Sequence, residues 1–237
     1  GRAARVLGTR TGLSAKTIHS SIYELKHLEV REEARAVNDP GYRMVFPLRT
    51  EEPTGRVLIV DEASMVGDKD QAHDLLRFGS GRLLRDLLTF ARADRGVAKV
   101  VFVGDPVQLP PVGETFSGAL DPGYLREAFG LEAEAFELKE VQRQKEGSAI
   151  LERATAVRDA VQSRSFNRFS LEGSGAEITE ADSEGAIDLV LQDLQSSARG
   201  ASALVTYSNR QALGFNRAVR GRLWGREDTE VRVGDIL

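Results

Sequence analysis

Two short apolar runs stand out from the polar stretches of this chain, and each ends in acidic residues. Residues 56–64, RVLIVDEAS, pass from four apolar β-formers directly into Asp61 and Glu62. Residues 98–105, AKVVFVGD, end in the same way at Asp105. Continuous apolar runs are typical of parallel strands that are covered on both faces. The pattern therefore predicts two buried parallel strands whose carboxyl ends carry polar groups.

Helical segments are expected to follow the first run. Residues 68–79 and 81–96 are both expected to be helical. In the second segment apolar residues recur at helical spacing, namely Leu83, Leu84, Leu87, Leu88 and Ala91. Strands that alternate with helices imply an α/β layer fold.

The pattern weakens after residue 116. A polar, glycine-containing stretch at 166–185 is interpreted as a linker, and a domain boundary is predicted near residue 135, giving domains 1–135 and 136–237. The elements expected around the linker are a short edge strand at 133–141, a helix at 148–161 capped by Ser148, a helix at 185–194, a third buried strand at 202–209 and a helix at 210–225.

Residues 28–55 lie between the first helix-like segment and the first apolar run. Asn38–Gly41, NDPG, is a turn signal, and YRMVFPL after it has the composition of a strand. A protruding hairpin and a plain connecting loop both fit this pattern.

The composition is that of an ordinary globular protein, with 237 residues, 41% hydrophobic and 29% charged. No apolar run approaches the roughly 18 residues that span a bilayer, and the arginine-rich start lacks the apolar core of a signal peptide. No cysteine is present, which excludes disulfides and thiolate metal sites. A cytoplasmic protein without a membrane partner is expected. Because the net charge is −4, any nucleic-acid contact must come from a local groove.

Asp61 and Glu62 suit a magnesium–nucleotide site. A carboxylate at a strand end can hold Mg²⁺, a hard cation that takes oxygen ligands. Its neighbour faces another direction and can polarise an attacking water. The alternative is that the two residues only cap the next turn.

Asp105 and Gln108 form a second group of polar residues, beyond the second strand, with Pro110 and Pro111 stiffening the chain after them. Open α/β sheets bind ligands outside the carboxyl ends of their strands. The Gln108 amide can hydrogen-bond a phosphate without titrating. The alternative here is a polar turn closed by two prolines.

The phosphate-binding loop that such a site needs, G-x-x-x-x-G-K followed by Ser or Thr, does not occur in the sequence. GLSAKT carries a glycine and a Lys–Thr pair. However, Gly12 lies four positions before Lys16, whereas the loop needs glycine immediately before lysine. This segment also follows an Arg- and Ala-rich, helix-like stretch instead of a buried strand.

Four segments together resemble the motor core of superfamily 1 DNA helicases, and the likeness is closest to the RecD-like branch. In order they are VLIVDEASMV, VFVGDPVQLPPV, LKEVQRQ and ALVTYSNRQALGFN. The resemblance implies two incomplete RecA-like lobes made of parallel sheets covered by helices. It also implies ATP and Mg²⁺ as cofactors, single-stranded DNA as partner, and movement in the 5′-to-3′ direction. DNA-repair, recombination or conjugation proteins would be further partners.

The resemblance also implies roles for residues at the nucleotide. Asp61 matches the magnesium ligand and Glu62 the general base. Gln108, beside Asp105, matches the glutamine that contacts the γ-phosphate and links it to the DNA groove. Arg143 matches the arginine of the second lobe that reaches the γ-phosphate, a kind of residue worth about 10³–10⁵ in rate in related ATPases. Taken alone, Arg143 could equally be a helix-surface residue paired with a nearby glutamate.

The residues implied at the DNA come from several segments. Thr17 and His19 match one DNA-contacting motif, and His19 could bind a phosphate or stack on a base; the alternative is a structural histidine. Asn209 matches a position near the nucleotide and DNA faces, or serves only as a helix cap. The full set implied at the DNA is Gly1, Arg2, Thr17, His19, Pro110 and Asn209.

The chain corresponds to the part of such a helicase that begins after the phosphate loop and ends before the late motifs. As a fragment it is expected to lack useful ATP hydrolysis. The helicase half of a conjugative relaxase, an RNA helicase, a different P-loop ATPase and a non-hydrolysing DNA-binding scaffold of the same fold are the alternatives.

Overall fold

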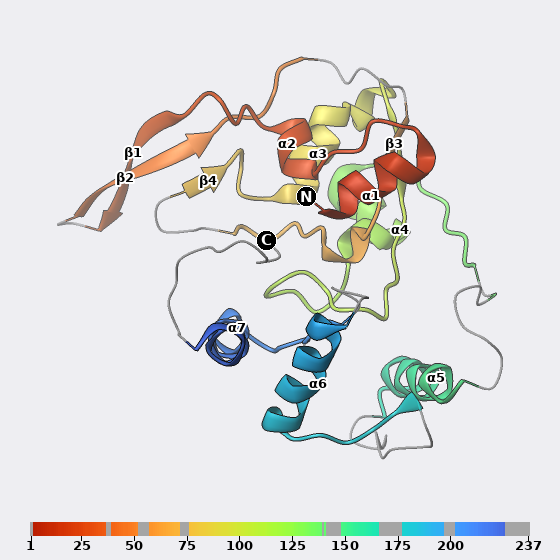
Figure 1. The fold of residues 1–237 in the computed structure, drawn as a ribbon. Helices are drawn as coiled ribbons and strands as arrows, with labels where there is room; N and C mark the ends of the chain where they lie inside the picture. Colours follow the sequence, from red (N-terminus) through yellow and green to blue (C-terminus); the bar gives the residue numbers. More distant parts are fainter. Residues whose placement is uncertain are drawn as a thin grey trace. The chain divides into compact units, whose positions relative to one another are not determined.

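A computed structural model describes most of the chain. The backbone is described for residues 2–36, 39–51, 57–71, 76–138, 140, 148–165, 177–196 and 202–225, and the side chains for these residues except Arg2 and residues 31–43. The chain divides into two units, Gly1–Glu140 and Val141–Leu237, and each is considered by itself (Figure 1).

The first unit alternates strands and helices. In chain order its elements are α1 (Arg2–Thr11), α2 (Ile18–Ile22), β1 (Glu29–Ala36), β2 (Asp39–Phe46), β3 (Val57–Val60), the 3₁₀ turn η1 (Ala63–Met65), β4 (Leu76–Phe78), α3 (Leu83–Ala91), η2 (Ala93–Arg95), β5 (Lys99–Phe102), η3 (Gly118–Leu120) and α4 (Pro122–Phe129).

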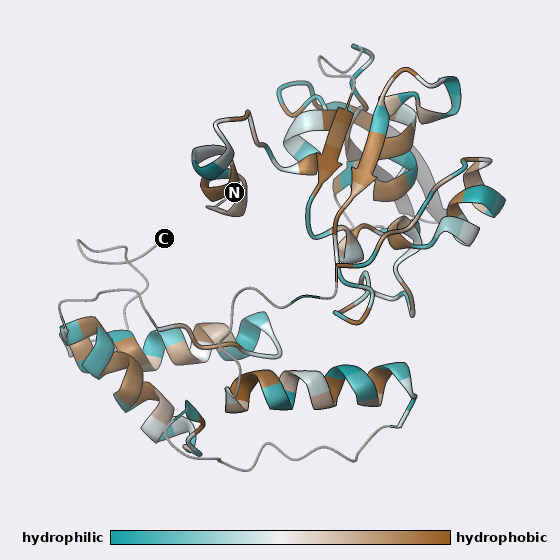
Figure 2. Ribbon diagram, turned by 90° about the vertical axis from the view of Figure 1, so that its right-hand side faces the viewer, coloured by the Kyte–Doolittle hydropathy of each residue, from teal (hydrophilic) through white to brown (hydrophobic). Residues whose placement is uncertain are grey.

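The two apolar runs form neighbouring parallel strands, as predicted. β3 pairs with β5 in a register that runs from Val57 opposite Lys99 to Val60 opposite Phe102. The two appear as adjacent brown strands in Figure 2. Because the strands are parallel and in register, the loops that follow them leave the sheet at the same edge. The α/β fold expected from the pattern is confirmed.

Burial of the β3–β5 pair differs from the expectation. Side chains alternate, so that Val60 is buried while Ile59 and Val57 on the other face are 64% and 53% exposed. On β5 and just beyond it, Val101 and Val103 are each 45% exposed. Within the described residues, therefore, only one face of this pair is covered.

The covered face packs on α3. Leu84, Leu87 and Leu88 of this helix are at most 5% exposed and belong to the core cluster with Val60. Their three- and four-residue spacing places them on one side of the helix, as the sequence predicted. Ala119 and Leu125, from η3 and α4, complete this side of the core.

A second sheet contains the predicted hairpin. β1 and β2 pair antiparallel, and their connected ends project away from the other elements of the unit (Figure 1). Of the two interpretations of residues 28–55, the hairpin is therefore the observed one. β4 extends this sheet by pairing parallel with β2, Met44 opposite Leu76. The helix expected at 68–79 is wrong in its described part: residues 68–71 form a loop, and pairing with β2 holds residues 76–78 extended.

Helix α4 was not anticipated, although its signals are present in the sequence. Asp121 is the N-cap and accepts a hydrogen bond from the Tyr124 backbone N–H at 3.0 Å. Pro122 occupies the first helical position, and Gly130 ends the helix in the left-handed region. An acidic cap, an N-terminal proline and a C-terminal glycine are the standard helix boundary residues.

A buried polar pair ties α2 to α3. Tyr23, which is 1% exposed, donates its hydroxyl to Asp86 Oδ2 at 2.8 Å, and Asp86 is itself 4% exposed. The Ser80 backbone N–H donates to the same oxygen at 3.0 Å. Burial and the neighbouring Asp86 carboxylate raise the pKa of Tyr23, so its hydroxyl stays a donor. Gly79, at φ +49°, allows this approach, since a Cβ there would overlap Asp86 Oδ2.

The second unit contains three described helices, α5 (Ala149–Gln162), α6 (Ser183–Gln195) and α7 (Asn209–Trp224). They correspond to the three helices expected in this region. Ser148 is the N-cap of α5, but its side chain makes no capping bond. Instead the Glu177 carboxylate accepts from the Ala149 N–H at 2.7 Å. Arg222 on α7 pairs with Glu184 and Asp188 on α6.

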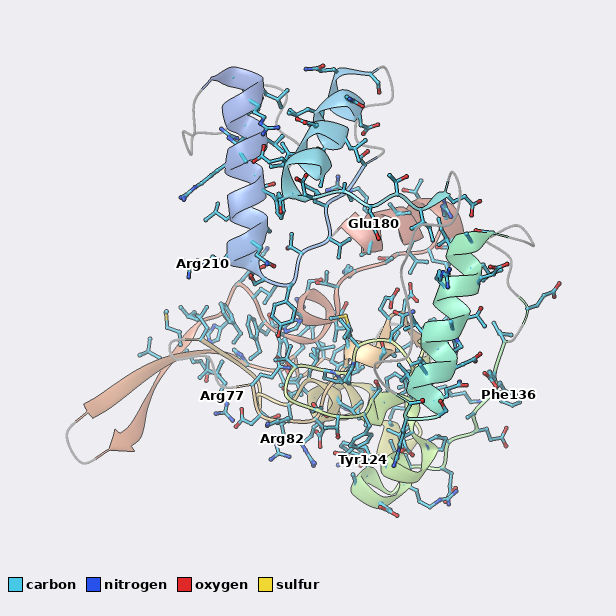
Figure 3. All side chains as sticks on the ribbon, turned by 90° about the horizontal axis from the view of Figure 1, so that it is seen from below. Arg77, Arg82, Tyr124, Phe136, Glu180 and Arg210 are labelled. Atoms are coloured by element: carbon cyan, nitrogen blue, oxygen red, sulfur yellow. The ribbon has the colours of Figure 1, made fainter. Side chains whose placement is uncertain are left out.

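Two expected strands are not observed. Residues 202–209 and the described part of 133–141 carry no strand assignment. Val205 and Tyr207 are 96% and 99% exposed, and Leu138 is 96% exposed. In Figure 3 Phe136 lies on this extended segment after α4. An apolar run becomes a strand only when another strand accepts its backbone hydrogen bonds, and no described segment pairs with either one.

Replacing Tyr23 by Phe should destabilise the protein. The substitution removes one donor from a buried carboxylate, which costs about 1–3 kcal/mol in unfolding free energy. Tyr207→Phe is the matched control, because the exposed Tyr207 side chain should change stability by less than about 0.5 kcal/mol. Denaturant unfolding of both variants checks this. Equal effects of the two substitutions would show that the Tyr23–Asp86 bond adds nothing.

Candidate nucleotide site

The loops after β3 and β5 lie side by side. The Val103 N–H donates to the Val60 carbonyl at 2.8 Å, and the Ala63 N–H donates to the Val103 carbonyl at 2.9 Å. The backbone pairing of the two strands thus continues past their assigned ends. The loop that carries Asp61 and Glu62 and the loop that carries Asp105 therefore begin side by side at the carboxyl edge of the parallel pair.

Glu62 has an unusual backbone. Its φ and ψ are 53° and 39°, the left-handed region, which costs a residue with a Cβ about 1–2 kcal/mol. The Glu62 N–H donates to Asp61 Oδ1 at 3.0 Å, and this contact uses one of the two carboxylate oxygens. η1 begins directly afterwards. Both side chains are exposed at the strand ends, and backbone strain of this kind clusters at functional sites.

Gly104 allows the close approach of the two loops. A Cβ at this position would lie 2.9 Å from the Ser64 nitrogen and 3.1 Å from the Ala63 nitrogen. These are backbone atoms, so they cannot rotate away. On the other side of the same turn, the buried Ser117 hydroxyl donates to the Ser64 carbonyl at 2.8 Å.

Gln108 stands on a compact turn. The Asp105 side chain accepts the Val107 N–H at 3.0 Å, and the Asp105 carbonyl accepts the Gln108 N–H at 3.1 Å. Asp105 therefore shapes this loop. Pro111 is buried and anchors the far side, whereas Gln108 is exposed. The turn leaves the Gln108 amide open to a ligand at the edge where Asp61 and Glu62 lie.

Thr17 and His19 lie on α2. Thr17 is the N-cap of this helix, and its hydroxyl oxygen accepts the Ser20 N–H at 3.3 Å. The His19 ring meets Phe78 edge-on at 4.9 Å and Tyr23 at 5.5 Å between centroids. Burial lowers the pKa of His19 from its usual 6.5. A lowered pKa means that the folded protein favours the neutral His19 ring. The contribution of this neutral ring to the free energy of unfolding is therefore complete above pH 6.5 and is lost as the pH falls through the lowered pKa.

The remaining predicted residues are only partly within the described structure. Gly1 and Arg143 lie outside the described residues, and Arg2 is described by its backbone alone, at the start of α1. Pro110 is half-buried in the Gln108 loop. Asn209 is the first residue of α7, but Ser208 is its N-cap and accepts the Gln211 N–H at 3.3 Å. The interpretation of Asn209 as a helix cap is therefore wrong.

A model of the family described as AAA domain matches residues 1–180, most of the chain. The chain belongs to this family of P-loop NTPases. Searches among curated proteins and among solved structures gave no match. Membership in this family implies binding of a nucleoside triphosphate, typically with Mg²⁺, and makes ATPase activity the expected chemistry.

The residues at the sheet edge fit a magnesium–nucleotide complex. Mg²⁺ keeps several waters and takes only one or two protein carboxylates besides the phosphates, a share that a single carboxylate such as Asp61 can supply. No cluster of three or more His, Cys, Asp or Glu residues is arranged around a metal position in the part of the chain that the structure describes. Asp61 would hold the ion, with Glu62 and Gln108 beside it.

Two other features of this AAA-domain chain are a cavity and the length and hydrophobicity of its helices. A cavity of about 580 Å³ lies where α3 and α4 end, between Arg85, Arg92, Arg95 and Phe129, and none of the predicted nucleotide residues lines it. Among the described helices, none has the length and hydrophobicity to cross a membrane.

Replacing Glu62 by Gly should not weaken the fold. Relief of about 1–2 kcal/mol of left-handed strain exceeds the roughly 0.5–1 kcal/mol that glycine adds to the unfolded chain's entropy. The unfolding free energy should therefore rise by up to about 1 kcal/mol. Glu62→Gln keeps the same backbone preference and should leave stability unchanged. Urea unfolding measures both, and a loss of stability in Glu62→Gly would contradict the strain assignment.

Proposed function

We propose that this chain is the core of an ATP-dependent DNA helicase or translocase of the RecD-like branch of superfamily 1. It would couple Mg-ATP hydrolysis to movement on single-stranded DNA in the 5′-to-3′ direction. The observation that carries the proposal is the meeting of Asp61, Glu62 and the Gln108 loop at one edge of the β3–β5 pair. Their order and their VDEAS and GDPVQLPP contexts resemble those of the helicase motifs.

Each residue at the nucleotide has a distinct task under this proposal. Asp61 holds the magnesium ion, which neutralises charge on the phosphate oxygens. Glu62 orients the attacking water and takes its proton, and the left-handed backbone sets the direction of its carboxylate. The Gln108 amide binds the terminal phosphate through a hydrogen bond, which does not depend on pH because the amide does not titrate. Arg143 would add positive charge at the same phosphate.

Under this proposal, His19 on α2 binds single-stranded DNA. His19 presents an exposed imidazole that meets Phe78 edge-on and Tyr23 at a tilt, and an aromatic ring of this kind can stack on an unpaired base. Its lowered pKa keeps the ring neutral near pH 7, so it acts by stacking and hydrogen bonding and not as a cation. Arg2, Thr17, Pro110 and Asn209 are proposed to contact the strand nearby. Proteins of DNA repair, recombination or conjugation are the proposed partners.

The decisive experiment is ATP hydrolysis by the full-length protein with and without a single-stranded oligonucleotide. Strong stimulation by DNA is expected. Glu62→Gln should lower turnover by at least about 10² while sparing ATP binding, because it keeps size and polarity but cannot accept the proton. Normal turnover in Glu62→Gln would reject the general-base role, and a folded protein that never hydrolyses ATP would favour the scaffold alternative.

His19→Ala should weaken binding of single-stranded DNA without changing its salt dependence. Loss of one stacked base costs about 1–3 kcal/mol. Phosphate contacts by cations set the slope of log affinity against log salt, and a neutral ring does not contribute to it. Fluorescence anisotropy titrations at several salt concentrations measure both quantities. A reduced slope in His19→Ala would mean that the ring binds DNA as a cation.

A further inference from the structure

A glutamate that belongs to none of the helicase-like motif assignments joins the two loops of the candidate site. Glu114 lies six positions after Gln108, and its Oε1 accepts the Lys69 backbone N–H at 3.1 Å. Lys69 lies in the loop that leads away from Asp61 and Glu62. This side chain therefore connects the loop bearing the acidic pair to the loop bearing Gln108.

Gly67 leaves the space that the Glu114 carboxylate occupies. A Cβ on Gly67 would overlap Glu114 Oε1 and would lie 2.8 Å from Pro111 Cβ. Only the missing side chain lets both groups rest against the Gly67 backbone. The Gly67 carbonyl in turn accepts the Leu84 N–H at 2.8 Å, which fixes this part of the loop to the start of α3.

A turn holds Glu114 in position. The Glu114 N–H donates to the Pro111 carbonyl at 2.9 Å, and Gly113 between them has φ +78°. These features define a turn that needs glycine at its third position. The Lys69 ammonium donates to the Gly113 carbonyl at 3.1 Å. Lys69 therefore makes two contacts with the other loop, one from its backbone N–H to Glu114 and one from its ammonium group to Gly113.

The loop that follows Asp61 and Glu62 is also attached to α3 and α4, through Asp68. Asp68 is 5% exposed, and its Oδ2 accepts from Arg85 at 3.2 Å and from the Tyr124 hydroxyl at 2.9 Å. Tyr124 and Arg82, which also approaches this carboxylate, are labelled in Figure 3. These contacts attach the loop of Asp61 and Glu62 to α3 and α4, so the Lys69–Glu114 contact joins the Gln108 loop to an anchored segment.

We propose that Glu114 is a positioning residue that locks the Gln108 loop to the loop of Asp61 and Glu62. The inference rests on the proposed function for its consequence in catalysis, since the lock sets where Gln108 stands relative to the catalytic carboxylates. Glu114 itself touches neither nucleotide nor water in this role. A misplacement of about 1 Å in such an arrangement can cost about 10²-fold in rate.

Amide hydrogen exchange tests the lock without any need for activity. In Glu114→Ala of the full-length protein, the amides of Lys69, Val107 and Gln108 should exchange faster together, while the unfolding midpoint stays near that of the wild type. Glu114→Gln keeps an oxygen that accepts the Lys69 N–H and should restore slow exchange. Glu127→Ala, an exposed glutamate of α4, is the matched control and should leave these amides unchanged.

Steady-state ATP hydrolysis tests the consequence. Glu114→Ala should lower kcat by about tenfold or more with KM for ATP changed less than threefold, because binding groups remain and only their alignment is lost. Glu114→Gln should recover most of the rate. Gly67→Ala, which pushes Glu114 out of its place, should resemble Glu114→Ala in both exchange and kcat.

The outcomes separate this inference from the proposed function. If the wild type hydrolyses ATP and Glu114→Ala matches it in exchange and in kcat, the lock is overturned and the proposed function stands. If the wild type does not hydrolyse ATP but the three amides respond together to Glu114→Ala, the proposed function fails and the lock stands. Equal loss in Glu114→Gln and Glu114→Ala would overturn the hydrogen bond as its basis.

Discussion

The parallel pairing of β3 with β5 is the interaction on which the candidate site depends. Two strands in register deliver their following loops to one edge, and the Val103 and Ala63 hydrogen bonds carry that pairing into the loops themselves. Gly104 then sets the separation, because any side chain there would strike the backbone of the acidic turn. Backbone pairing thus brings the two loops to one edge, while the side chains of Asp61, Glu62 and Gln108 remain exposed and available to a ligand.

This geometry has a cost in stability that falls at Glu62. A left-handed glutamate is unfavourable by about 1–2 kcal/mol, which glycine or asparagine would largely avoid. The turn persists because Asp61 accepts the Glu62 N–H, and Ser117 accommodates the following Ser64 carbonyl. Strain held by such contacts is what a site needs when a carboxylate must point away from the course of its strand.

The sequence predicted those features that arise from local pattern. The apolar runs gave β3 and β5, and the spacing of Leu84, Leu87 and Leu88 gave α3. It failed where pairing partners decide: residues 76–78 joined β2 as a strand, while residues 202–208 pair with no strand among the described residues and are largely exposed. The site residues were predicted from motif order. Glu114 was not, because its role comes from the bare Gly67 beside it, a contact between residues 47 positions apart.

The free energy of the Glu114 hydrogen bond suits a contact that positions one loop against the other better than one that stabilises the fold. A hydrogen bond of this kind contributes about 0.5–1.5 kcal/mol net, far less than the burial of the α3 leucines. Coupling free energies between binding sites are typically about 1–3 kcal/mol. A contact within or just below that range is enough to hold the Gln108 loop in one position relative to the acidic loop. Asp68, buried and bonded to Arg85 and Tyr124, instead attaches the acidic loop to α3 and α4.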